Sequence, residues 1–242
     1  MNSSIDQKRA IITGASSGIG KATALALAKA GFSLALVGRS VERLGAVAEA
    51  ARAQNVDVKV YDFDLLRLDQ VKEKFAAIAK EFGQVDILIN NAGMGYTGSL
   101  EATSLEDWQQ VMNLNLTSVF QATLGVLPQM RAQQQGQIIN VSSIAAKTVF
   151  PEWGAYCISK AALNSLSQAI AVEEKANGIR VTTIMPGAVN TPIWDTETVD
   201  ADFDRTIMLT PEDIANSILH IAQSPANANI EEMIVTPSAG AL

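Results

Sequence analysis

Seven short apolar segments recur along the chain, separated by longer stretches in which apolar and polar residues mix. The segments are 9–13, 33–38, 56–64, 85–90, 137–142, 179–185 and 232–236. Most of them are rich in β-branched residues and are bounded by Gly, Pro or Asn, which is the pattern of β-strands. The pattern therefore predicts about seven strands.

The stretches between these segments have the period of amphipathic helices. One set of apolar positions is Val71, Phe75, Ile78 and Phe82. Spacings of three and four residues place such a set on one face of a helix, which would pack against a sheet. A long helix is also expected from about residue 104 to residue 135. Pro128 should kink or restart that helix because proline lacks a backbone N–H.

Strands that alternate with helices predict a parallel sheet with crossover helices on its two faces. Most strand segments are continuously apolar, as strands buried on both sides are, whereas 56–64 alternates and is expected at an edge. We therefore predict one α/β domain over 1–242, a Rossmann-like doubly wound parallel sheet of about seven strands with helices on both faces. Residues 190–210 are polar, acidic and aperiodic, and we expect them to form a mobile lid over a substrate.

Composition narrows the class of protein. The net charge of −7 argues against a nucleic-acid partner, because phosphate contacts need clustered Lys and Arg. The single cysteine, Cys157, allows no disulfide within the chain, and the start MNSSIDQKR lacks the apolar core of a signal peptide. No window of about 18 residues is apolar enough to span a membrane. The expectation is a cytoplasmic protein with no membrane partner, and no metal site, because His220 has no ligand-spaced neighbours.

The first strand segment leads into the glycine-rich stretch TGASSGIG, residues 13–20. Glycines at 14, 18 and 20 permit a tight turn and a close approach of the backbone to a phosphate. The helix that follows would present backbone N–H groups and its positive dipole end to a pyrophosphate. The predicted contacts with a dinucleotide in this turn are Gly14, Ser16, Ser17, Gly18, Ile19 and Gly20.

The end of the second strand segment bears on the choice of dinucleotide. An NAD-preferring site carries an acidic residue here, whereas this chain has Gly38 followed by Arg39. A planar guanidinium suits a 2′-phosphate, so Arg39 predicts NADP(H) as the cofactor. The alternative is that Arg39 is a solvated turn residue.

Further motifs follow in a fixed order. They are NNAG at 90–93, Asn115 in NLNLTSVF, Ser143 in INVSS, YCISK at 156–160 and Pro186-Gly187. Together with the glycine turn, these motifs resemble the short-chain dehydrogenase/reductase family, in its single-domain branch of about 250 residues. The resemblance covers about residues 8–240.

The resemblance implies a role for each of four residues. Tyr156 would be the catalytic acid/base, and Lys160 would bind the nicotinamide ribose and activate the tyrosine. Ser143 would orient the substrate carbonyl, and Asn115 would support a proton relay through water.

The resemblance also implies the remaining contacts with NADP(H), beside those of Tyr156 and Lys160. Those on the adenosine side are Asp64, Leu65, Asn91, Ala92 and Gly93. Those at the nicotinamide carboxamide are Pro186, Gly187, Val189 and Thr191. A homotetramer or homodimer is expected through the helices at about 104–134 and 154–176.

Tyr156 and Lys160 lie one helical turn apart, so they share a helix face. A tyrosine titrates near pH ~10, and lowering its pKa by about three pH units corresponds to about 4 kcal/mol. An ammonium about 4 Å away supplies about 4 kcal/mol at an effective dielectric near 20. We therefore expect Lys160 to lower the pKa of Tyr156. Alone, the pair could also be a surface helix with a solvated lysine; Ser143 and the glycine turn favour the catalytic interpretation.

The function expected is NADP(H)-dependent transfer of hydride between nicotinamide and a ketone or secondary alcohol. The first interpretation is a carbonyl or 3-oxo/3-hydroxy acid reductase acting on a small molecule, and Trp153 and Trp194 are candidates for its pocket wall. A 3-oxoacyl-[acyl-carrier-protein] reductase is the alternative, although Val172-Glu173-Glu174 stands where a basic docking residue is often found.

Two other classes were weighed. The first is a non-catalytic NADP(H)-sensing regulator, but such sensors typically lack the Tyr/Lys pair. The second is a sugar-nucleotide epimerase, but those chains are generally longer and have a different glycine spacing.

Overall fold

The computed structural model describes residues 7–240. Seven strands form one sheet in the order β3-β2-β1-β4-β5-β6-β7, and every neighbouring pair is parallel. The strands are β1 (Arg9–Thr13), β2 (Ser33–Gly38), β3 (Val58–Asp62), β4 (Ile87–Asn90), β5 (Gly136–Val141), β6 (Ile179–Pro186) and β7 (Glu232–Val235). This is the predicted doubly wound α/β fold. The predicted domain, 1–242, includes ends that lie outside the described residues.

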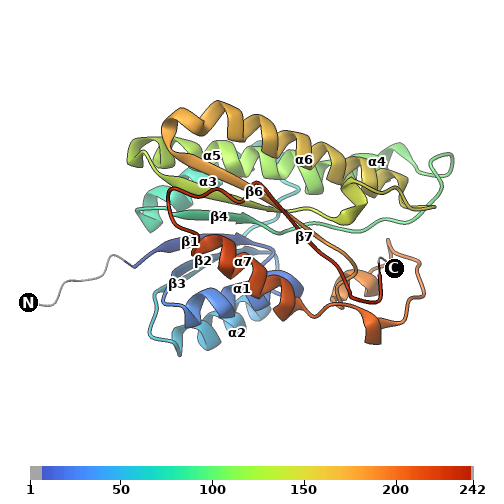
Figure 1. The fold of residues 1–242 in the computed structure, drawn as a ribbon, viewed down its shortest axis with the longest axis horizontal. Helices are drawn as coiled ribbons and strands as arrows, with labels where there is room; N and C mark the ends of the chain where they lie inside the picture. Colours follow the sequence, from blue (N-terminus) through green and yellow to red (C-terminus); the bar gives the residue numbers. More distant parts are fainter. Residues whose placement is uncertain (1–6, 241–242) are drawn as a thin grey trace, which may run out of the picture.

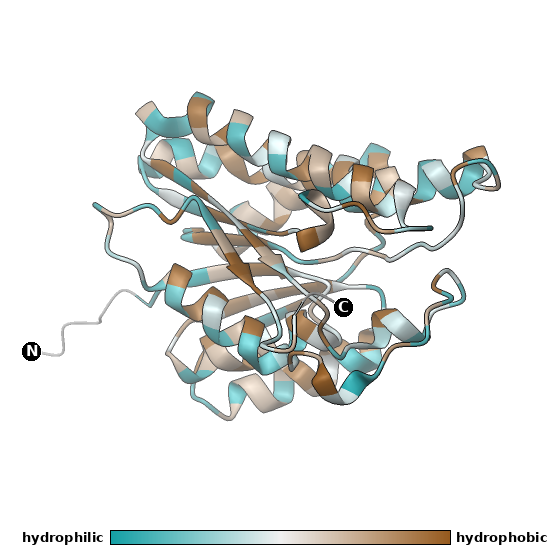
Figure 2. Ribbon diagram, turned by 45° about the vertical axis from the view of Figure 1, so that its right-hand side comes forward, coloured by the Kyte–Doolittle hydropathy of each residue, from teal (hydrophilic) through white to brown (hydrophobic). Residues whose placement is uncertain are grey.

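Helices cover both faces of the sheet (Figure 1). On one face lie α1 (Gly18–Lys29), α2 (Val41–Arg52) and α7 (Pro211–Ala222). On the other lie α3 (Leu68–Phe82), α4 (Leu105–Met112), α5 (Ser118–Gln133) and α6 (Gly154–Glu174). Figure 2 shows the apolar strands enclosed between helices of mixed polarity.

Two apolar cores, one on each face, hold the three layers together. Within β1, Ala10 and Ile12 belong to one core and Ile11 to the other, because successive side chains of a strand point to opposite faces. The helix positions predicted to face a sheet, Val71, Phe75, Ile78 and Phe82, are all buried in the core beneath α3. The hydrophobic pattern therefore located both the elements and their buried faces.

The alternating segment is an edge strand, as predicted. β3 pairs with β2 alone, and its side chains range from buried to exposed along the strand. β7 forms the opposite edge.

The expected restart of the helix at Pro128 is wrong, and a kink there stays a prediction. The proline lies exposed inside α5, which runs through it as one helix. The irregularity occurs instead at Asn113–Thr117, a single π-helical segment that joins α4 to α5. Single π turns inside helices are often found at functional sites, and this one contains Asn115.

The segment 190–210 holds only short 3₁₀ turns, at Pro192–Asp195 and Arg205–Ile207. Its two ends lie side by side, because Val189 pairs with Leu209 in an isolated parallel bridge. Within residues 7–240, no helix has the length and apolar character needed to cross a membrane.

Candidate active site

A cavity of about 860 Å³ opens at the carboxyl ends of the strands. In parallel α/β sheets this edge is where ligands bind. Of the residues predicted from the sequence, those that line the cavity are Gly14, Ser16, Ser17, Gly18, Ile19, Arg39, Asp64, Leu65, Asn91, Ala92, Gly93, Ser143, Tyr156, Lys160, Pro186, Gly187, Val189 and Thr191. Two predicted residues, Gly20 and Asn115, do not line the cavity. Each contacts residues that do line it.

The turn between β1 and α1 needs its glycines for conformation and for space. Gly14 and Gly18 have φ angles of +65° and +50°, which only glycine adopts readily. A Cβ on Gly20 would collide with the Gly14 carbonyl and lie 2.5 Å from Asn91 Nδ2. That amide donates to the carbonyls of Thr13 and Gly14, at 3.0 and 3.3 Å. Gly20 thus shapes the turn, and its contact with a cofactor stays a prediction.

The same turn leaves the start of α1 available to an anion. Ser17 is the N-cap residue, but its side chain makes no capping hydrogen bond. The first turn of the helix has no acidic residue, so its partial positive charge is not offset locally. Thr191 packs across the turn, since a Cβ on Gly18 would lie 3.2 Å from its Cγ2. These residues fit a pyrophosphate.

Two arginines stand at the end of β2. Arg39 is exposed and lines the cavity as predicted, and Arg43 lines it as well. Ser40 caps α2 by accepting a hydrogen bond from the Arg43 N–H at 3.3 Å, which places Arg43 in the first helical turn. Arg43 was not predicted from the sequence. Its spacing from Arg39 carries no helical signal, because Arg39 precedes the Ser40 cap of α2.

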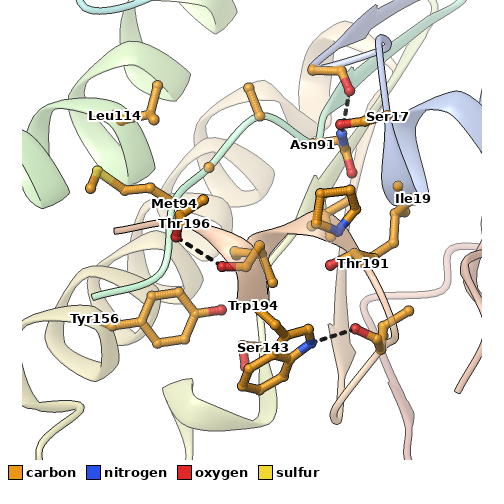
Figure 3. A pocket seen from close by; sticks show the side chains of 18 of the residues that line it. Ser17, Ile19, Asn91, Met94, Leu114, Ser143, Tyr156, Thr191, Trp194 and Thr196 are labelled. Atoms are coloured by element: carbon orange, nitrogen blue, oxygen red, sulfur yellow. Dashed lines mark hydrogen bonds between the residues drawn. The ribbon is translucent and has the colours of Figure 1, made fainter. Parts of the chain in front are cut away.

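Three predicted catalytic side chains meet at the other end of the cavity. Ser143 directly follows the fifth strand segment, and its hydroxyl accepts the Ala145 N–H at 3.1 Å. Tyr156 lies in the first turn of α6, and Figure 3 shows its hydroxyl directed toward the Ser143 side. Lys160, one turn further along α6, is 5% exposed, and its ammonium lies 5.7 Å from the centre of the Tyr156 ring. The grouping of these residues agrees with the sequence prediction.

The pKa of Tyr156 departs from that prediction. Burial raises the pKa of Tyr156 to about 12, and hydrogen bonding with Ser143 opposes that rise only in part. The Lys160 ammonium donates to the Val141 carbonyl at 3.0 Å, and burial lowers the pKa of Lys160 to about 8. The expected lowering of the Tyr156 pKa by Lys160 is therefore wrong, because burial of the phenol dominates and Lys160 is not among the groups that shift this pKa.

Asn115 is fully buried in the π-helical segment. Its Oδ1 accepts the Met94 N–H at 2.8 Å, and its Nδ2 donates to the Met94 carbonyl at 2.9 Å and to Ser159 Oγ at 3.0 Å. Ser159 in turn donates to the Tyr156 carbonyl at 2.7 Å. The Asn115 side chain thus ties the loop after β4 to the start of α6, which is a positioning role. Its part in a proton relay stays a prediction.

Comparison with known proteins decides the family. A family model described as short chain dehydrogenase matches residues 8–202. The chain belongs to the short-chain dehydrogenase/reductase family. This confirms the resemblance inferred from the order of the motifs.

Relatives extend over nearly the whole of this short-chain dehydrogenase/reductase. An uncharacterized oxidoreductase of Staphylococcus saprophyticus is 34% identical over 234 residues, covering 96% of this chain and 98% of the relative. An alcohol dehydrogenase from Thermococcus sibiricus, complexed with 5-hydroxy-NADP, is 30% identical with a TM-score of 0.89, and the match covers 97% and 98% of the two chains. A metagenomic short-chain oxidoreductase in complex with NADP is also 30% identical, with a TM-score of 0.83 and coverage of 96% and 97%.

The aromatic side of the site in this short-chain dehydrogenase/reductase was only partly foreseen. Trp153 and Trp194 line the cavity as suggested, and Phe150 and Phe203 line it as well. Nothing in the pattern of the acidic segment marked Phe203, because a single aromatic residue carries no periodic signal. Figure 3 shows Trp194 and Tyr156 on the same side of the pocket.

Proposed function

We propose that the protein is an NADP(H)-dependent oxidoreductase that transfers hydride between nicotinamide and a ketone or secondary alcohol. One observation carries the proposal: Ser143, Tyr156 and Lys160 lie together at one end of a cavity whose other end holds the glycine turn and Arg39. A bound nicotinamide would supply the hydride chemistry. Its diphosphate would lie at the start of α1, within reach of Ser17.

The protein's own part in a reduction follows from the site. Ser143 donates a hydrogen bond to the substrate carbonyl oxygen, where negative charge develops. Tyr156 delivers a proton to the same oxygen, and its raised pKa keeps the phenol protonated at neutral pH. Lys160 lies one helical turn after Tyr156 and would donate hydrogen bonds to the ribose hydroxyls of the cofactor. A tyrosine that holds its proton fits the role of the acid in this reduction.

The preference for NADP(H) over NAD(H) is supported by charge at the end of β2. Gly38 stands in place of an acidic residue, and Arg39 and Arg43 line the same part of the cavity. Two guanidinium groups suit a 2′-phosphate dianion. The NADP complexes of two structural neighbours agree with this assignment.

The test is NADPH oxidation with a panel of carbonyl compounds, compared between the parent protein and Tyr156→Phe. Loss of the proton donor should lower kcat by about 10²–10⁴-fold, while NADPH affinity stays within about threefold because the phenol contributes little to binding. Arg39→Ala should raise the Kd for NADPH but leave that for NADH unchanged. Turnover that survives in Tyr156→Phe would refute the assigned acid.

The same experiment separates the alternative class. A non-catalytic sensor would bind NADPH and turn over no carbonyl compound. A 3-oxoacyl-[acyl-carrier-protein] reductase would prefer an acyl-carrier thioester to free ketones. Val172 and Glu173 are exposed on α6, so a basic carrier-docking surface has no support there.

We also propose that the protein acts in the cytoplasm as a homodimer or homotetramer. Large apolar side chains are exposed on the outer helices, namely Leu105 on α4, Phe120 on α5, and Ile158 and Val172 on α6. A second copy would remove them from water. Light scattering on the purified protein should give a mass above 25.7 kDa by a factor of two or four.

A further inference from the structure

The catalytic end of the cavity is bordered by a continuous series of aromatic rings. Trp153 meets Tyr156 edge to face, with ring centres 5.4 Å apart at 70°. Trp153 also meets Trp194 at 5.8 Å and 69°, and Trp194 meets Phe203 at 5.4 Å and 80°. We call Trp153, Trp194 and Phe203 the aromatic wall. The wall starts beside Tyr156, the proposed proton donor, and extends into the segment 190–210.

The aromatic wall is fixed by hydrogen bonds rather than left free. The indole N–H of Trp194 donates to the Val189 carbonyl at 2.7 Å, so its one polar atom is already paired. The segment that carries Trp194 and Phe203 is tied to the loop after β4. Thr198 Oγ1 donates to the Gly95 carbonyl at 2.8 Å, and the Asp200 N–H donates to Thr97 Oγ1 at 2.7 Å. The wall therefore offers a preformed apolar surface.

Positive charge is distributed unevenly around the cavity. Among residues 7–240, its cationic lining residues are Arg39, Arg43 and Lys160. The two arginines belong to the far end, beside β2 and α2, and the Lys160 ammonium already donates to the Val141 carbonyl at 3.0 Å. No described arginine or lysine is left to meet an anionic group on a substrate.

The charged residue of the lid that does line the cavity is acidic. Asp195 directly follows Trp194, and its carboxylate accepts two hydrogen bonds from Arg205, at 2.6 and 3.2 Å. Arg205 itself is not part of the cavity wall. A substrate carboxylate beside the aromatic wall would lose water without gaining a cationic partner, which is costly, whereas a flat apolar group would pack edge to face against the indoles.

We propose, building on the function proposed above, that the substrate is an uncharged ketone or secondary alcohol with a flat, apolar and preferably aromatic group beside its reacting carbon. Substrates that carry a carboxylate near the carbonyl are selected against. This narrows the range set by the sequence, in which 3-oxo acids stood beside simple ketones.

The decisive comparison keeps the ketone and replaces the carboxylate by an uncharged ester. The ethyl ester of 3-oxobutanoate should have a kcat/KM at least about tenfold above that of the free acid, because only the acid buries an unpaired charge. For the flat group, 1-phenylethanone should exceed butan-2-one by about tenfold or more, the size of effect that an apolar pocket gives. An acid used as well as its ester, or phenyl and ethyl ketones used alike, would overturn the proposal.

Variants assign these preferences to the residues named. Asp195→Arg should raise kcat/KM for the acid at least fivefold and change that for the ester less. Glu197→Arg makes the same charge change in an exposed residue of the same segment that does not line the cavity, and should alter neither. An equal rise in kcat/KM for the acid in both variants would show only long-range electrostatic attraction, and would contradict a specific role of Asp195 in the cavity.

The aromatic wall has its own matched pair of variants. Trp194→Ala should lower kcat/KM for 1-phenylethanone about tenfold and for butan-2-one less than threefold, while Trp194→Phe keeps most of the aromatic preference. Equal losses for both ketones would contradict a role in selectivity.

The outcomes separate this inference from the function on which it rests. If calorimetry shows NADPH binding but no compound of the whole carbonyl panel is turned over, the proposed function fails and this inference fails with it. If the panel contains a substrate but 1-phenylethanone is not turned over, this inference alone is overturned. If the protein reduces these compounds but prefers the acid, the proposed function stands and this inference alone is overturned.

Discussion

At the scale of single residues, burial controls the chemistry of this site. Tyr156 and Lys160 share a helix face, as their spacing predicts, yet each has a pKa moved toward its neutral form. The spacing in the sequence predicts how far apart two residues lie on a helix. It does not predict how strongly each side chain is desolvated in the folded protein. The sequence-based estimate considered charge coupling but not this desolvation, so the expected shift in the pKa of Tyr156 has the wrong sign. Asn115 is a similar case. The order of the motifs picks out this residue, but only its three hydrogen bonds show which parts of the chain it holds together.

The lowered pKa of Lys160 predicts a pH dependence of cofactor binding. Below about pH 8 its ammonium is charged and attracts an anionic dinucleotide; above that pH it loses its proton and the attraction. We expect the Kd for NADPH, measured by calorimetry, to rise as the pH increases through about 8. Lys160→Arg should show no such inflection, since a guanidinium stays charged throughout. A parent Kd that is constant from about pH 7 to 10, across the interval between the lowered and the ordinary lysine pKa, would count against this assignment.

At the scale of elements, the turn between β1 and α1 is the part that sequence reasoning located best. Its glycines are recognisable in the sequence because the turn needs positive φ angles and space where a Cβ would be. Both requirements are met by glycine itself, whatever the surrounding structure. The seven strands were found for the same kind of reason, because β-branched apolar runs need no tertiary context to be recognised. The break between α4 and α5 was misplaced, because a proline on the exposed face can remain within a long helix. The π-helical segment at Asn113–Thr117 left no compositional signal.

Adding one methyl group tests the turn. In Gly20→Ala the new Cβ would collide with the Gly14 carbonyl and Asn91, so the turn must shift. We expect a loss of about 1–3 kcal/mol in the free energy of unfolding and a Kd for NADPH at least tenfold higher. Gly45→Ala is the control, since nothing lies within 4 Å of its Cβ position on α2. That variant should gain about 0.4–1 kcal/mol of stability and keep its affinity. Unaltered binding by Gly20→Ala would contradict the close approach of the turn to the cofactor.

At the scale of the whole molecule, the order of strands brings distant parts of the chain to one edge. β1 and β4 are neighbours although most of the first third of the chain separates them, so the glycine turn and NNAG share a single crevice. The alternation of strands and helices predicts a doubly wound parallel sheet, but it does not by itself predict that β1 and β4 are neighbours. The docking of 190–210 could not be predicted, since it depends on side-chain bonds to Gly95 and Thr97.

Cleavage by trypsin reports on that docking. Arg205 is the sole Lys or Arg within 190–210, so trypsin has a single target in the segment. We expect NADPH to slow cleavage at Arg205 by about fivefold or more, because Thr191 of the same segment lines the cofactor part of the cavity and local opening limits proteolysis. Arg205→Gln should remove this cut while other sites remain. Cleavage at the same rate with and without NADPH would mean that the segment does not respond to the cofactor.

The aromatic wall has one consequence beyond selectivity. Two of the chain's three tryptophans, Trp153 and Trp194, stand beside the reacting groups, and the third, Trp108, belongs to α4. Any molecule that stacks on the wall should quench the light these two indoles emit, so the protein's own fluorescence can follow occupancy in real time without a label. Replacing Trp108 with Phe would leave a signal that comes from the pocket alone.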